Sequence, residues 1–163
     1  MSNQISNTGN AKLLRSVDVA VNPDRALFQG RDVKGFEVPV DMANKMGIPG
    51  GDLGFAARDL LLIALAGCAG TSFLAGMRDA GQKISSLSMR VDGTLDTKPP
   101  QVFRHIRMLF RLSGPALDPE KVGAALAACH GTCSIAATLS HVAQIDSEFE
   151  IIPEPAAIAA PAA

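Results

Sequence analysis

The chain has 163 residues, a formal net charge of −1 at pH 7 and a pI of about 6.3. This balance excludes a basic footprint for nucleic acid or an anionic membrane, and the lack of Trp and Tyr removes the stacking platforms of single-strand binders. A chain of this length buries a hydrophobic core without the help of disulfide bonds, and its three cysteines are an odd number. We therefore expect redox-active or buried thiols in a reducing cytoplasm rather than a disulfide framework. The polar N-terminus also lacks the apolar segment of a secretory signal.

The N-terminal part predicts a meander of short antiparallel strands after a disordered lead at residues 1–11. Apolar side chains with a period of two, separated by turn signals, place the strands at residues 16–21, 26–29 and 36–40. Arg31 falls in the second turn, Gly30-Arg31-Asp32. Pro39 restricts the third strand to an edge or a strand end.

Residues 57–81 form the most apolar stretch, with Cys68 near its middle and no charge between Asp59 and Arg78. The stretch meets the length criterion for a membrane span. However, glycines, Thr and Ser interrupt it, and charges of both signs lie close to its ends. A helix that is apolar all round and not in lipid is buried in a large core or a subunit interface. The stretch therefore predicts a long central helix of a soluble protein, which presents a thiol.

The second half predicts two long strands, two helices and a last strand. Alternation places a hairpin at residues 86–112, with the turn at 96–101. Asp118, followed by Pro119, predicts the start of a helix that ends near residue 128. Thr132 is expected to cap a short helix at 133–139, and the last strand spans 142–151. The order predicts a single α+β domain at residues 12–152, with helices on antiparallel sheet, followed by a flexible Pro/Ala-rich tail at 153–163.

Cys68 and Cys133 lie 65 residues apart, and each has a structural and a chemical interpretation. Free cysteine is among the most buried residue types, so either thiol alone is compatible with a packing role. Cys133 is predicted in the first turn of a helix, where unpaired N–H groups favour the thiolate. Cys68 lies in the middle of its helix and would need an external cation, either Arg31 or Arg58.

Three segments resemble the OsmC/Ohr family of osmotically inducible and organic-hydroperoxide-resistance proteins. DLLLIALAGC, which ends at Cys68, is similar to the family run ELLLAALGGC. The segment CSIAATL, which begins at Cys133, matches the family's second cysteine run before the last strand, and QGRDVKG around Arg31 matches its N-terminal meander. The resemblance extends from about residue 17 to residue 151.

This resemblance implies an OsmC-like fold and an intertwined homodimer, whose long cysteine-bearing helices pack at the centre. It further implies that Cys68 attacks an organic hydroperoxide and passes through a sulfenic acid. Cys133 would resolve this acid as a disulfide, and Arg31 would hold the Cys68 thiolate and polarise the peroxide. No bound cofactor is implied; an external dithiol, typically lipoyl-linked, would reopen the disulfide.

Two positions depart from the family pattern. The peroxidases carry a glutamate ten residues before the first cysteine, where this chain has Arg58, followed by Asp59. Ser134 replaces the usual proline after the second cysteine. These departures leave an alternative open: a non-peroxidatic module of the same fold that binds a small hydrophobic metabolite or thioester.

The remaining polar features have simpler interpretations. Cys129 and Cys133 have three residues between them rather than the two typical of zinc sites, so we expect Cys129 to be a packed helix residue or an occasional substitute for Cys133. We predict no metal site. The arginines that alternate with apolar residues in the second long strand predict a solvated sheet face; they are Arg104, Arg107 and Arg111.

Overall fold

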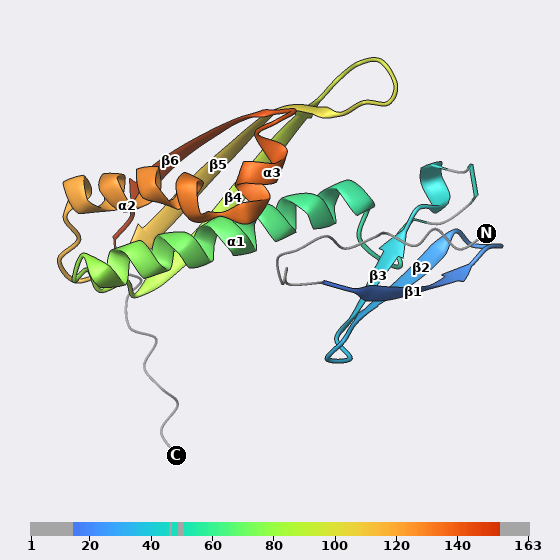
Figure 1. Ribbon diagram of the computed structural model, residues 1–163, viewed down its shortest axis with the longest axis horizontal. Coiled ribbons are helices and arrows are strands. Elements are labelled where there is room, and N and C mark those ends of the chain that lie inside the picture. The colour runs from blue at the N-terminus through green and yellow to red at the C-terminus, as the bar shows by residue number, and fades with distance from the viewer. Residues whose placement is uncertain (1–14, 46, 49–50, 154–163) are drawn as a thin grey trace, which may run out of the picture. The chain divides into compact units, whose positions relative to one another are not determined.

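The computed structural model describes residues 15–45, 47–48 and 51–153 (Figure 1). The predicted lead at 1–11 and all but the first residue of the predicted tail lie outside the described residues. The chain divides into two compact units, one ending at Ala57 and one starting at Arg58. The single domain at residues 12–152 stays a prediction.

The first unit is the predicted antiparallel meander. Its strands are β1 (Val17–Asn22), β2 (Leu27–Asp32) and β3 (Glu37–Asp41), in the sheet order β1-β2-β3. Pro39 lies in the edge strand β3, as expected, because its missing N–H takes no sheet partner there.

The turn predicted at Gly30-Arg31-Asp32 is wrong by about two residues. Arg31 lies inside β2, opposite Asp18 of β1 and Glu37 of β3. The turn follows Asp32, whose carboxylate accepts the N–H groups of Lys34 and Phe36, each at 2.9 Å. An aspartate that bonds the backbone two residues on starts a turn, so the turn begins at Asp32 instead of ending there.

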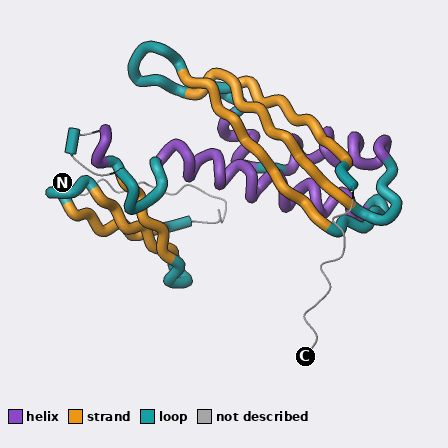
Figure 2. The backbone as a smooth tube through the Cα atoms, turned by 180° about the vertical axis from the view of Figure 1, so that it is seen from behind, coloured by secondary structure: helices purple, strands orange, loops and turns teal. Residues whose placement is uncertain are grey.

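The second unit holds a three-stranded sheet with all of its helices on one face (Figures 1 and 2). Its sheet order is β4-β5-β6. The elements, in chain order, are α1 (Ala57–Asp79), β4 (Ser86–Leu95), β5 (Phe103–Ser113), α2 (Pro119–Thr132), α3 (Ser134–Leu139) and β6 (Gln144–Ile151). The predicted α+β class and the β4–β5 hairpin are confirmed.

One strand direction differs from the expected antiparallel sheet. β6 pairs with β5 in parallel, with Ile106 opposite Ile145 and Phe110 opposite Phe149. A parallel pair needs a crossover of a dozen or more residues, usually helical. The segment with α2 and α3 supplies this crossover, because it returns the chain to the beginning of β5 before β6 starts.

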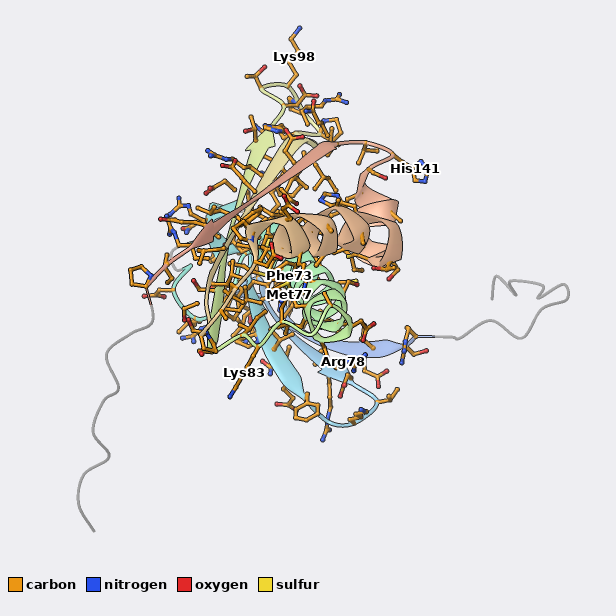
Figure 3. The ribbon with its side chains drawn as sticks, turned by 90° about the vertical axis from the view of Figure 1, so that its left-hand side faces the viewer. Phe73, Met77, Arg78, Lys83, Lys98 and His141 are labelled. Carbon is orange, nitrogen blue, oxygen red and sulfur yellow. The ribbon has the colours of Figure 1, made fainter. Side chains whose placement is uncertain are left out.

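The core of the second unit lies between the sheet and the helices. Phe73 of α1 and Phe110 of β5 are fully buried, with ring centroids 5.0 Å apart and planes tilted by 59°. Phe73 and Met77 point into this layer in Figure 3. Glycines in α1 permit close packing: a Cβ at Gly76 would lie 3.3 Å from the Ala125 Cβ of α2. α1 therefore contains glycine, a residue of low helix propensity, where α2 approaches it closely.

α1 is long and apolar enough to cross a membrane by length and composition, a test that core helices of soluble proteins also pass. Within the described chain, 28% of its most apolar stretch is buried. Large apolar side chains that stay exposed on it are Leu61, Ile63 and Leu74. The second unit therefore covers one side of this helix and leaves apolar surface on the other.

The opposite face of the sheet is polar and solvated, as predicted. Arg107 forms an ion pair with Glu148 across the β5–β6 pair, and Arg111 pairs with Glu150 at 2.8 Å. Arg104 pairs with Asp96 at 2.7 Å. The hydrogen bond from Arg107 lowers the pKa of the Glu148 carboxyl. Because each predicted arginine has a carboxylate partner, this face shows no unpaired basic stripe among the described residues.

Candidate thiol site

The junction between α2 and α3 differs from the sequence prediction. Asp118 caps α2 as expected, accepting the N–H of Glu120 at 2.9 Å. However, α2 continues to Thr132, whose hydroxyl donates back to the Cys129 carbonyl at 3.3 Å. Cys133, not Thr132, is therefore the N-cap of α3.

Cys133 terminates one helix and begins the next. Its N–H donates to the Cys129 carbonyl at 3.0 Å, and its sulfur accepts the N–H of Ala136 at 3.3 Å. The side chain is 1% exposed. The residue is therefore held by its backbone to α2 and by its sulfur to α3, and it is closed off from solvent.

Cys68 lies on the side of α1 that faces this junction. Its sulfur is 3.9 Å from the Ser134 hydroxyl, and the nearby Cys133 thiol lowers its pKa. The N–H groups of Ser134 and Ile135 also lower the pKa of Cys68. Unlike Cys133, Cys68 is half-buried. The structure thus brings the two predicted cysteines near each other, with Cys68 half-buried and Cys133 buried.

The surroundings shift the pKa values of the two thiols in opposite directions. Burial alone would raise the pKa of Cys68, but the Cys133 thiol and the donors of residues 134 and 135 outweigh it and lower this pKa. Burial and the hydrogen bond with Cys68 raise the pKa of Cys133. The sequence prediction that the helix start favours the Cys133 thiolate is therefore wrong, because burial and the interaction with Cys68 outweigh the N–H groups of Ala136 and Ile135.

Cys129 is a packed residue of the core, as expected. It is 1% exposed, and burial, followed by the proximity of Cys133 and Cys68, raises its pKa to about 11. Among the residues that the structure describes, no group of three His, Cys, Asp or Glu side chains is arranged to hold a metal ion.

The two arginines considered from the sequence lie in different parts of the chain. Arg31 belongs to the first unit, where its Nε is 3.6 Å from a Glu37 carboxylate oxygen, so its role toward Cys68 stays a prediction. Arg58 is at the start of α1, about 15 Å along the helix axis from Cys68. It donates to the Gln101 side chain at 3.4 Å. Arg58 is therefore not the cation that the Cys68 thiol was expected to need.

The three thiols are expected to react with iodoacetamide at different rates in the folded protein at pH 7. Cys68 reacts first, because it is accessible and its lowered pKa provides the thiolate. Cys129 and Cys133 react slowly, because both are buried and have raised pKa values. Peptide mass spectrometry over time measures the order, and a chain unfolded in guanidinium gives the control in which the differences shrink. Faster labelling of Cys133 than of Cys68 would contradict this site.

Comparison with known protein families shows to which family the chain belongs. A family model described as OsmC-like protein matches residues 50–148, more than half of the chain. The chain belongs to the OsmC-like family. The match contains Cys68 and Cys133, whereas Arg31 lies before it.

Solved structures agree on the fold of this OsmC-like chain. The OsmC-like protein of Mycoplasma pneumoniae superposes with a TM-score of 0.72 at 18% identity, covering 86% of this chain and 99% of that one. The organic hydroperoxide resistance protein OhrB of Bacillus subtilis gives a TM-score of 0.59 at 18% identity, covering 85% and 98%. A search of curated proteins finds no significant match. At these identities the likeness shows the fold alone.

Proposed function

We propose that this OsmC-like chain is a thiol-dependent peroxidase that reduces organic hydroperoxides through a Cys68 sulfenic acid resolved by Cys133. The observation that carries the proposal is the proximity of a partly accessible thiol of lowered pKa to a second, buried thiol. Proteins of the same fold include one named as an organic hydroperoxide resistance protein, from Legionella pneumophila, with a TM-score of 0.64.

This proximity supports a two-step reaction. The Cys68 thiolate attacks the terminal oxygen of the hydroperoxide, the O–O bond breaks, and the alcohol leaves after it takes up a proton, while Cys68 becomes a sulfenic acid. The Cys133 thiol then attacks the Cys68 sulfur and displaces water, which forms a disulfide. The proximity of the two thiols in the reduced state, where each shifts the pKa of the other, supports this second step.

Further parts of the proposal follow the family resemblance. Arg31 would lie over the Cys68 thiolate and polarise the peroxide. The exposed apolar side of α1 would pack in a homodimer, because such a surface is costly in water. An external dithiol such as a lipoyl-linked one would reduce the disulfide, with no bound cofactor, in a reducing cytoplasm.

A turnover assay tests the proposed activity. The purified protein is mixed with cumene hydroperoxide and dihydrolipoamide, and hydroperoxide loss is followed over many equivalents. We expect sustained consumption that requires both the protein and the dithiol, with hydrogen peroxide and glutathione as comparison reagents. No consumption beyond the uncatalysed rate would reject the peroxidase.

One observation favours the alternative of a hydrophobic-ligand module. Beside α1, a shallow hollow of about 250 Å³ is lined mainly by apolar side chains, which are Leu62, Ile63, Ala66, Met89 and Val91, with Asp59 as the charged member. A stoichiometric hydrophobic metabolite or thioester retained on purification, together with no hydroperoxide consumption, would decide for this module.

A further inference from the structure

The sulfur of Cys68 receives its polar contacts from three consecutive residues at the start of α3. The hydroxyl of Ser134 lies 3.9 Å from this sulfur, and the thiol of Cys133 and the N–H groups of Ser134 and Ile135 also lower its pKa. A thiolate accepts hydrogen bonds and cannot donate them. When Cys68 is ionised, the Ser134 hydroxyl must therefore be the donor in the 3.9 Å contact.

Ser134 has no competing use for this hydroxyl among the described hydrogen bonds. Its side-chain oxygen makes the contact with Cys68, whereas its carbonyl accepts from Thr138 at 2.8 Å. The residue is exposed, so its side chain does not fill the core. Removing the hydroxyl therefore changes the surroundings of the Cys68 sulfur and leaves the packing and the helix largely as they are.

We propose that Ser134 is a positioning residue for Cys68, whose hydroxyl donates to the sulfur of Cys68 and holds it in place at the start of α3. Proline, which the family resemblance leads one to expect here, has neither a hydroxyl nor an N–H donor. The serine thus adds a hydroxyl donor from within the second unit, to the same sulfur whose pKa the Cys133 thiol lowers. Its contribution to peroxide reduction rests on the proposed function, whereas its effect on the ionisation of Cys68 does not.

The pH dependence of Cys68 alkylation tests this role in the full-length chain. Ser134→Ala removes the hydroxyl and is expected to move the profile to higher pH, so that the rate at pH 6 falls about fivefold. Ser134→Pro removes both donors at a first helical position that accepts proline, and is expected to lower the rate further. Ser134→Thr keeps a hydroxyl and is expected to stay close to the parent.

Ser140→Ala is the matched control. This residue caps the other end of α3, and its hydroxyl donates to the Ala137 carbonyl at 2.9 Å, away from Cys68. We expect its profile to coincide with that of the parent. Rates at high pH, where Cys68 is fully ionised, should agree among all variants. Such agreement would show that the variants change the ionisation of Cys68 and not the access of the reagent to its sulfur.

A Ser134→Ala profile that coincides with the parent would overturn the proposal, as would an equal shift in Ser140→Ala. The alanine and threonine variants decide the matter even if the proline variant does not fold. A shifted profile in a protein that consumes no hydroperoxide would support the role of Ser134 while rejecting the peroxidase. A failure of the proposed role of Ser134 can thus be distinguished from a failure of the proposed peroxidase activity.

Discussion

Cys68→Ser is expected to slow hydroperoxide reduction by at least about 1000-fold, because it removes the attacking nucleophile. A serine hydroxyl stays protonated at neutral pH where the Cys68 thiol is shifted toward its thiolate. The measurement is the initial rate of cumene hydroperoxide loss with excess dihydrolipoamide. A variant as fast as the parent would remove Cys68 from the mechanism.

Two matched variants separate the roles of the remaining thiols. Cys133→Ser should retain the first reduction and stop at a Cys68 sulfenic acid, which a dimedone adduct detects. Cys129→Ser places a hydroxyl in the core but leaves the reacting pair intact, so turnover per folded molecule should persist. Equal loss in both variants would show that Cys133 is not the specific resolving thiol.

Phe110→Ala is expected to lower the free energy of unfolding by about 3–5 kcal/mol. The side chain is fully buried in β5, and its loss would create a cavity and remove the tilted ring contact with Phe73. Urea denaturation measures the change.

Val142→Ala is the control for this substitution. Val142 is 54% exposed in the turn before β6, so its truncation should cost less than about 0.5 kcal/mol. A cost for Phe110→Ala as small as this would contradict the core assigned to the second unit.

Local signals predicted much of this fold. Asp118 and Pro119 mark the start of α2. The Asp118 side chain accepts a hydrogen bond from an N–H group that has no partner within the helix, and Pro119 has no N–H group that would need one. Alternation in β5 gives its buried and charged faces correctly. The direction of β6 was missed, because alternation is identical in parallel and antiparallel strands and the crossover decides which one forms.

The candidate site was predictable in part. The resemblance selected Cys68 and Cys133, and the structure places them close enough to shift each other's pKa. The direction of their pKa shifts was not predictable, because it depends on the burial of each sulfur and on the hydrogen-bond donors around it. Composition and spacing do not show which groups surround each sulfur. The sequence signal for these surroundings was the polar Ser134 beside Cys133.

Mapping the disulfide bonds after a single oxidation tests the central claim most directly. The reduced protein is treated with one equivalent of cumene hydroperoxide under anaerobic conditions, its free thiols are alkylated, and the peptides are assigned by fragment ions. We predict one Cys68–Cys133 disulfide per chain, with Cys129 alkylated. Three alkylated thiols after the hydroperoxide, or a bond that joins Cys129 instead of Cys133 to Cys68, would contradict the account.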